Sequence, residues 1–300
     1  MKLLVWNPAY ERHMTDEGEQ LQRGLQRAGW TLGDPEEATA PGVERVLVGD
    51  PRDWMIDRNL RPDEALARLG HVARFDGPVH VVCKDAWNRT EYQERVATAL
   101  DASGLVHYYD AAGIRERCPW TARYPMVRTW HSVDAGECAG HVSRRGRTKA
   151  ILTGHLGRDF YPERAALAAE AAALGLDVMP HPGYRNTERH TPRYLAAIAG
   201  YKVHVCTTSR VRVALRKIVE SVAVGCIPVT DLPAAEVVPG IDAALVRVPG
   251  DASIAEWDAA IRKAADSWDP DIALKHAAEA WAQHDWRIAG ERLDRALCAS

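Results

Sequence analysis

The stretch of sequence that decides the fold runs from Val203 to Asp231. It opens with Val203-His-Val-Cys206, a short run rich in β-branched residues, which predicts a buried strand. A polar turn, Thr207-Thr-Ser209, leads into a predicted basic helix over residues 210–224, and Ile227-Pro-Val-Thr230 predicts a second strand. Free N–H groups, the helix dipole and fixed cations all favour an anion. The stretch therefore predicts a phosphate-binding strand, turn and helix.

Polar side chains on this stretch are candidate ligand contacts. Thr208, Ser209, Arg216 and Lys217 are the nearest candidates for phosphate. Glu220 lies farther along the predicted helix, where its carboxylate is placed to accept hydrogen bonds from a sugar or ribose diol. The simpler role for Glu220 is an i,i+4 ion pair with Arg216 on a solvent-facing helix. Apolar neighbours on the helix argue against that exposed setting.

Charge is distributed unevenly along the chain. The 300 residues carry a net charge of −3, with 26% charged and 46% hydrophobic residues, as expected of a soluble globular protein. Residues 141–220 nevertheless contain 14 Lys and Arg against 6 Asp and Glu. A cationic block in an otherwise acidic protein predicts an anionic ligand held in a cleft, the alternative being an Arg-rich solvated surface.

Apolar runs and helical patterns alternate along both halves of the chain. Such alternation predicts doubly wound parallel sheets. The segment 134–148 is rich in Gly and Arg without an apolar period, and it predicts an interdomain linker. We expect an N-terminal Rossmann-like domain over residues 1–140, a second over 141–285, and a C-terminal helix over 286–300 that packs on the first domain. A single-sheet enzyme with a long C-terminal extension is the alternative.

Four segments in order carry a family resemblance. They are Ile151-Leu-Thr-Gly-His-Leu-Gly157 with Tyr161-Pro-Glu-Arg164, then His181-Pro-Gly-Tyr184, then Lys217 to Asp231, and finally His284-Asp-Trp286. Together they span roughly residues 149–300, and they resemble GT-B glycosyltransferases of the "glycosyl transferases group 1" kind, including bacterial and bacteriophage members. The resemblance implies an α/β fold of two Rossmann-like domains facing a cleft. It also implies a nucleotide-sugar donor, most simply a UDP-sugar, bound by the second domain, and an acceptor bound by the first.

The resemblance extends to individual donor-binding residues. It assigns Glu220 to the ribose hydroxyls. Glycine turns permit close backbone approach, and arginines clamp diphosphates bidentately. The full predicted donor set is Gly154, Arg158, Arg164, His181, Tyr184, Thr208, Ser209, Arg216, Lys217 and Glu220. Retaining enzymes of this kind often carry a second glutamate eight positions earlier, where this chain has Arg212. That departure favours inversion.

The catalytic base is expected in the N-terminal domain, at a strand end facing the cleft. Asp85 and His13 are favoured, because Asp and His both suit proton abstraction from a hydroxyl. Spacing does not choose among all the candidates, which also include Asp16, Asp50, Asp53 and His131. Trp54, Trp87 and Trp120 stand among cations in the same loops and are predicted to stack on the acceptor, with loop packing as the alternative.

No metal is predicted. The spacing Asp269-Pro-Asp271 precedes a helix, so N-capping is the simpler interpretation, and helix dipoles and cations can neutralise a leaving diphosphate. The six cysteines form no CxxC pair and are expected to be mostly buried free thiols. We also expect no bound cofactor, no signal peptide and no membrane span, and hence a cytoplasmic protein, in the host cytoplasm if phage-encoded.

The sequence therefore predicts a metal-independent glycosyltransferase, with DNA carrying a hydroxymethylated pyrimidine as one acceptor. A saccharide, lipid-linked or small-molecule acceptor is the alternative, since the acidic N-terminal half lacks a basic footprint for duplex DNA. Two other classes remain open. One is another nucleotide-using α/β enzyme such as an epimerase or kinase, although neither GxGxxG nor GxxxxGK[ST] occurs. The other is a non-catalytic protein that binds sugar or nucleic acid.

Overall fold

The computed structural model describes residues 1–6, 17–52, 61–84, 90–109, 111–142, 147–181 and 191–300. Contacts divide them into two compact units, described separately below. The N-terminal unit comprises Met1–Trp130 with Trp286–Ser300, and the C-terminal unit comprises His131–Asp285. Within the described ranges, no helix combines the length and the apolar character needed to cross a membrane.

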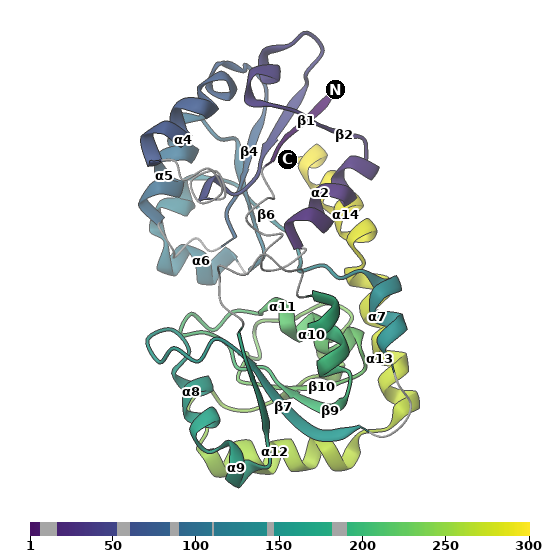
Figure 1. Ribbon diagram of the computed structural model, residues 1–300. Coiled ribbons are helices and arrows are strands. Elements are labelled where there is room, and N and C mark those ends of the chain that lie inside the picture. Colours follow the sequence, from purple (N-terminus) through teal and green to yellow (C-terminus); the bar gives the residue numbers. More distant parts are fainter. Residues whose placement is uncertain (7–16, 53–60, 85–89, 110, 143–146, 182–190) are drawn as a thin grey trace. The chain divides into compact units, whose positions relative to one another are not determined.

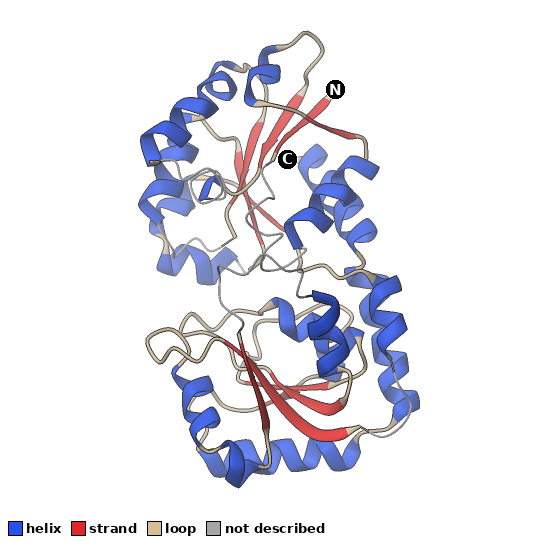
Figure 2. Cartoon of the chain, in the orientation of Figure 1, coloured by secondary structure: helices blue, strands red, loops and turns tan. Residues whose placement is uncertain are grey.

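The N-terminal unit is built on one parallel sheet with the strand order β2-β1-β3-β4-β5-β6 (Figures 1 and 2). Its strands are short apolar runs such as Leu3-Leu4-Val5, buried on both faces as expected of a parallel sheet covered by helices. The strands are β1 (Lys2–Val5), β2 (Trp30–Leu32), β3 (Arg45–Val48), β4 (Val79–Val82), β5 (Gly104–His107) and β6 (Met126–Arg128). The helices are α2 (Glu17–Arg27), α4 (Pro62–Arg68), α5 (Thr90–Ala99), α6 (Ala111–Arg117) and α14 (Trp286–Ala299).

Helix α14, the last of the chain, packs against α2 near the beginning of the chain (Figure 1). Their backbones approach closely at Gly24 and Gly290, where a Cβ atom on either residue would collide with the facing helix. Asp294 on α14 accepts a hydrogen bond from Nε1 of Trp30 at 2.8 Å and pairs with Lys2. The C-terminal helix therefore completes the N-terminal unit.

The C-terminal unit holds a second parallel sheet, of order β11-β10-β9-β7-β8. Helices α10 and α11 cover one face and α12 the other (Figure 1), where Leu152, Val205 and Trp257 belong to one core. The strands are β7 (Thr148–Gly154), β8 (Asp177–Pro180), β9 (Tyr201–Val205), β10 (Ile227–Thr230) and β11 (Val246–Arg247). The helices are α7 (Ala135–His141), α8 (Pro162–Ala169), α9 (Ala171–Leu174), α10 (Thr191–Ile198), α11 (Arg216–Ala223), α12 (Ile254–Ser267) and α13 (Pro270–His284).

Both sheets follow one pattern of connection. If each unit's strands are counted from its own first, both sheets begin with the order 2-1-3-4-5. In such sheets the direction of winding reverses between the first and third strands, and ligands bind outside the carboxyl ends of those strands. The switch points are therefore at β1 and β3 in one unit and at β7 and β9 in the other. The expected pair of doubly wound sheets is confirmed, and the single-sheet alternative is wrong.

Two local predictions are wrong. The helix expected over 210–224 begins only at Arg216, because Val211 and Val213 are buried in an irregular segment and Arg212 adopts a left-handed backbone with φ 51°. The linker expected over 134–148 contains α7. Asp134 caps that helix by accepting a hydrogen bond from the Glu137 N–H at 3.1 Å, a capping signal that outweighs its glycines.

Candidate functional site

A glycine turn follows β7 at the switch point of the C-terminal sheet. Gly154 has φ 112°, a conformation that L side chains rarely adopt, and a Cβ there would lie 2.8 Å from Nη1 of Arg164. The His181 N–H donates to the Gly154 carbonyl at 3.1 Å. Two predicted site residues from separate motifs, Gly154 and His181, therefore meet at this strand end.

Arg164 is buried directly beside this turn. The chain enters α8 at Pro162, whose fixed φ suits the first helical position, and Arg164 follows two residues later with 3% of its surface exposed. Its Nε and Nη2 atoms donate to the side chain and the carbonyl of Thr207, both at 3.0 Å. The guanidinium also lies 3.9 Å from the ring centroid of Tyr161. Burial lowers its pKa, but an arginine stays charged, so a fixed cation lies at the switch point.

Lys217 brings a second cation to the same strand end. From the first turn of α11, its Nζ donates to the Thr153 carbonyl at 3.3 Å. Burial and the nearby Arg164 charge lower the pKa of Lys217 to about 7. An anion bound beside both cations would favour the protonated form of Lys217. The arrangement therefore suits a phosphate or diphosphate.

A buried polar network beneath the turn holds Lys217 in place. Ser221 donates to the Lys217 carbonyl, and its Oγ lies 2.5 Å from Nδ1 of His204. The hydroxyl proton of Ser221 is thus engaged, which assigns the imidazole proton to Nδ1 and leaves Nε2 to accept from Thr153 Oγ1 at 2.8 Å. Burial and the neighbouring cations hold the pKa of His204 well below its usual range. This neutral histidine, in the middle of an apolar strand, was missed by the sequence analysis.

The hydroxyl-rich turn after β9 contacts protein groups on both sides. Thr208 donates from its N–H and from its Oγ1 to the two carboxylate oxygens of Asp231, at 2.6 and 2.8 Å. Ser209 accepts from the Val211 N–H at 3.3 Å. All three turn residues, Thr207, Thr208 and Ser209, are buried, and α11 begins several residues later. Thr207 and Asp231 were not predicted as site residues, although both follow predicted strands.

Glu220 forms the i,i+4 ion pair with Arg216, but in a buried setting. The Arg216 Nε lies 3.2 Å from the Glu220 Oε1, and each side chain is only 8% exposed. Glu220 stands three positions after Lys217 on α11, and its charge helps to raise the pKa of the Cys138 thiol on α7, after burial. The Arg212 Nη2 donates to the Gly250 carbonyl at 2.7 Å.

The other predicted residues are not brought together by any contact described. Arg158 is exposed in the turn before α8. Trp120 is 9% exposed and donates to Thr90 Oγ1 at 2.6 Å, as in the loop-packing alternative. His131 is buried with its Nε2 3.0 Å from the Ala214 carbonyl oxygen. Residues that lie outside the described ranges are His13, Asp16, Asp53, Trp54, Asp85, Trp87 and Tyr184.

Asp50 is described, and its carboxylate accepts five hydrogen bonds from Arg52, Lys84 and Gln93. Burial alone would raise its pKa, but the charge and hydrogen bonds of Arg52 and the charge of Lys84 outweigh that effect and lower the pKa to about 2. A carboxylate held so firmly ionised is a poor acceptor of a proton from a hydroxyl near neutral pH.

Asp269 behaves as the N-cap predicted for it. Its Oδ1 accepts from the backbone N–H groups of Asp271 and Ile272 at 2.9 and 3.0 Å. Among the described residues, no group of three or more His, Cys, Asp and Glu side chains could hold a metal ion. The six cysteines are free, and all but Cys298 are buried, as predicted.

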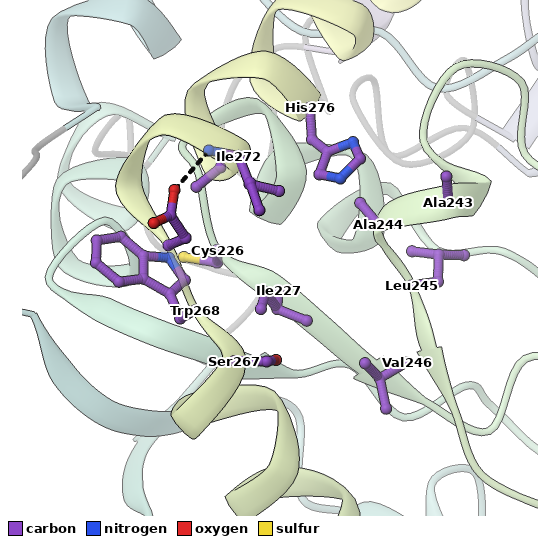
Figure 3. A pocket seen from close by; sticks show the side chains of 12 residues that line it. Cys226, Ile227, Ala243, Ala244, Leu245, Val246, Ser267, Trp268, Ile272 and His276 are labelled. Carbon is purple, nitrogen blue, oxygen red and sulfur yellow. Dashed lines mark hydrogen bonds between the residues drawn. The ribbon is translucent and has the colours of Figure 1, made fainter.

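A separate hollow of about 180 Å³ lies elsewhere on the C-terminal unit (Figure 3). It is lined by Cys226 and Ile227 at the amino end of β10, Val246 on β11, and Trp268 and His276. Figure 3 shows mostly apolar side chains around it. Because ligands in such sheets bind at the opposite, carboxyl ends of the strands, we do not assign the predicted site to this hollow.

Several solved structures resemble the entire chain. Anabaena HepE in complex with UDP and glucose aligns with a TM-score of 0.57 and 14% identity over 100% of both chains. HepE with UDP-glucose gives a TM-score of 0.55 and 14% identity, again over both whole chains. An alpha-glucosyltransferase in complex with UDP-glucose and DNA containing an abasic site gives 0.52 and 8% over 95% of each chain. At these identities the likeness establishes the fold, an α/β fold of the GT-B type.

No protein-family model matches the sequence, and no curated protein matches it significantly. The narrower assignment to the group 1 kind stays a prediction.

Proposed function

We propose that this protein is a glycosyltransferase that transfers a sugar from a nucleotide-sugar donor to an acceptor hydroxyl. The observation that carries the proposal is a pair of cations, the buried Arg164 and the partly buried Lys217, beside the Gly154 turn at a switch point. Fixed cations at this position suit the diphosphate of a donor and of a departing nucleotide. The likeness to structures solved with UDP and UDP-glucose supports UDP-glucose as the first donor to test.

In the proposed complex the diphosphate lies against the Gly154 backbone, where the missing Cβ permits close approach. Arg164, fixed by Thr207, and Lys217, fixed by Thr153, neutralise the phosphates as the bond to the anomeric carbon breaks. Glu220, farther along α11, accepts hydrogen bonds from the ribose hydroxyls, while its ion pair with Arg216 holds the carboxylate in place. The C-terminal unit is then the donor unit and the N-terminal unit the acceptor unit.

We propose direct attack of the acceptor hydroxyl with inversion at the anomeric carbon. The position at which many retaining relatives carry a second glutamate is Arg212, whose guanidinium donates to a backbone carbonyl. Asp85 and His13 remain the proposed bases, and Asp50 is not proposed because its carboxylate is already engaged by five hydrogen bonds from Arg52, Lys84 and Gln93.

Calorimetric titration tests the donor proposal directly. We expect UDP and UDP-glucose to bind and uridine to bind more weakly, because uridine lacks the diphosphate. Lys217→Gln should weaken the binding of UDP more than the binding of uridine. Lys263→Gln, which removes an exposed charge on α12, should change neither affinity. Equal losses for UDP and uridine in Lys217→Gln would point to damaged folding and count against the site.

Turnover separates an enzyme from a binding protein and identifies the acceptor. Hydroxymethylated DNA is one acceptor to test, since a similar fold was solved with UDP-glucose and DNA, and a saccharide panel is the other. Incubation with labelled UDP-glucose should transfer label to one class of acceptor. DNA binding should weaken steeply as salt rises, because each phosphate contact releases about one counterion, whereas a neutral saccharide should show almost no salt dependence. Donor binding without transfer to any acceptor would favour the non-catalytic alternative.

A further inference from the structure

The carboxyl end of the N-terminal sheet gathers charged and aromatic side chains from three neighbouring strands. Trp6 follows β1, Asp50 and Arg52 follow β3, and Lys84 follows β4. The strands β1, β3 and β4 are adjacent in the sheet, and β1 and β3 are the strands at which the winding reverses. The cluster therefore occupies the switch point of this unit, the counterpart of the site at β7 and β9.

Asp50 is the anchor of this cluster. Its Oδ1 accepts from the backbone N–H and the Nε of Arg52, at 3.0 and 2.9 Å. Its Oδ2 accepts from Nη2 of Arg52 at 2.8 Å, from the Lys84 N–H at 3.0 Å and from Gln93 at 3.3 Å. A carboxylate that accepts so many hydrogen bonds serves to orient its donors. It fixes the Arg52 guanidinium by two parallel bonds and fixes the backbone of Lys84.

Two cations and an indole ring surround that anchor. Arg52 and Lys84 are 7% and 8% exposed, and Trp6 is 6% exposed. The Lys84 Nζ lies 5.8 Å from the Trp6 ring centroid, and the ring sits so close to Gly49 that a Cβ there would lie 2.9 Å from it. Charge attraction is stronger in such partly buried surroundings than in water. Cations held in fixed positions with little solvent are well suited to an anionic ligand, and an adjacent aromatic ring suits a flat ligand ring.

We propose that this cluster of Trp6, Asp50, Arg52 and Lys84 binds a phosphate group of the acceptor. The phosphate pairs with Arg52 and Lys84, and Trp6 packs against the neighbouring sugar or base. The proposal rests on the proposed function for the statement that the ligand is the acceptor. The anion site itself rests only on the geometry of the N-terminal unit. A phosphate monoester of a sugar and a phosphodiester of a nucleic acid share this chemistry.

Titration of inorganic phosphate into the full-length protein, with saturating UDP to fill the donor site, tests the anion site. We expect Lys84→Gln to weaken phosphate binding tenfold or more, while Lys84→Arg retains most of it. Arg115→Gln removes one exposed cation from the same unit and serves as the matched control. An unchanged affinity for UDP and an unchanged melting temperature in Lys84→Gln would show that the variant is folded. Equal phosphate affinities for Lys84→Gln and Arg115→Gln would overturn the proposal.

Two further ligands identify the source of the phosphate. Glucose 1-phosphate represents a sugar monoester, and a short oligothymidylate represents a nucleic acid. The ligand whose binding is weakened by Lys84→Gln identifies the acceptor class. If Lys84→Gln weakens the binding of neither ligand, the proposal is again overturned. If UDP does not bind, the proposed function fails. The phosphate titration without UDP then still compares Lys84→Gln with Arg115→Gln, so the two failures are distinguishable.

Discussion

The Lys217 ammonium and the Thr153 carbonyl oxygen lie 3.3 Å apart and join the start of a helix to the end of a strand. The same two residues are also connected by a second, largely buried route through Thr153 Oγ1, His204 and Ser221. Lys217 is therefore held at both its side chain and its backbone, and the cation is positioned before any ligand arrives. Such preorganisation reduces the ordering that binding would otherwise require.

Donor affinity should decrease as the pH rises above 7. The pKa of Lys217 in the free protein is about 7, so its ammonium is present below that pH and lost above it. Where the bound diphosphate keeps Lys217 charged, the loss of affinity approaches about tenfold per pH unit above the free pKa. Phosphate itself titrates near pH 6, so titrations of UDP from pH 7 to 9 isolate the lysine. Lys217→Arg should flatten the profile, and a wild-type profile that is already flat would contradict the assignment.

Replacement of Glu220 by Gln should weaken the binding free energy of UDP by about 1.5–3 kcal/mol, the scale of a hydrogen bond to a charged group. A comparison with 2′-deoxy-UDP makes the test specific. The wild type should distinguish the two nucleotides, and Glu220→Gln should distinguish them much less, because the carboxylate that reads the ribose is gone. Glu170→Gln, at an exposed position of the same unit, is the control. The ribose assignment fails if Glu220→Gln retains full discrimination.

Gly154→Ala should impair both stability and donor binding. Alanine would have to adopt the positive φ of this position, which costs an L residue about 1–2 kcal/mol. Its methyl group would also lie only 2.8 Å from Nη1 of Arg164. Gly42→Ala is the matched control, since Gly42 also has a positive φ but nothing within 4 Å of its Cβ position. We expect Gly154→Ala to lower the melting temperature more than Gly42→Ala does. Of the two variants, only Gly154→Ala should reduce the affinity for UDP. Equal effects would mean that the collision with Arg164 is relieved freely.

Gly290→Ala should destabilise the N-terminal unit, because the methyl group would collide with the α2 backbone at Gly24. The collision is with backbone rather than with a flexible side chain, so we expect a loss of about 2 kcal/mol or more, within the range for overpacked cores. Gly113→Ala on α6 is the control, since its Cβ position is open and alanine favours a helix by about 1 kcal/mol over glycine. Thermal unfolding measures both, and a melting temperature for Gly290→Ala at or above that of the wild type would contradict the close approach.

The sequence predicted the parts of the fold that depend on local patterns. The strands expected at Val203–Cys206 and Ile227–Thr230 from their β-branched residues correspond to β9 and β10. The start of α11 was placed too early because the cationic residues of 210–215 resemble a helix. The segment is irregular instead, with Val211 and Val213 buried and Arg212 in a left-handed conformation, a tertiary effect. Helix α7 was missed because the glycines around Asp134 hid its capping pattern.

The candidate site was predictable where a motif carried it and not where partners come from distant segments. Gly154, Arg164 and Lys217 were expected, and the structure brings them together at one strand end. Thr207 holds Arg164 across 43 positions of sequence, and Asp231 holds Thr208 across 23. Pairings of this kind depend on the order of strands in the sheet, which local spacing does not encode. Asp50 was considered as a base partly for the same reason, since two of its donors, Lys84 and Gln93, lie 34 and 43 positions away in sequence.

The packing of α14 on α2 also has a consequence for synthesis on the ribosome. Residues 131–285 emerge as one complete unit while the earlier residues still lack the helix that covers them, because Trp286–Ala299 are synthesised after them. The face of α2 that α14 covers therefore stays exposed on the nascent chain until Trp286–Ala299 have been synthesised. The second unit can therefore fold during synthesis before the first is complete.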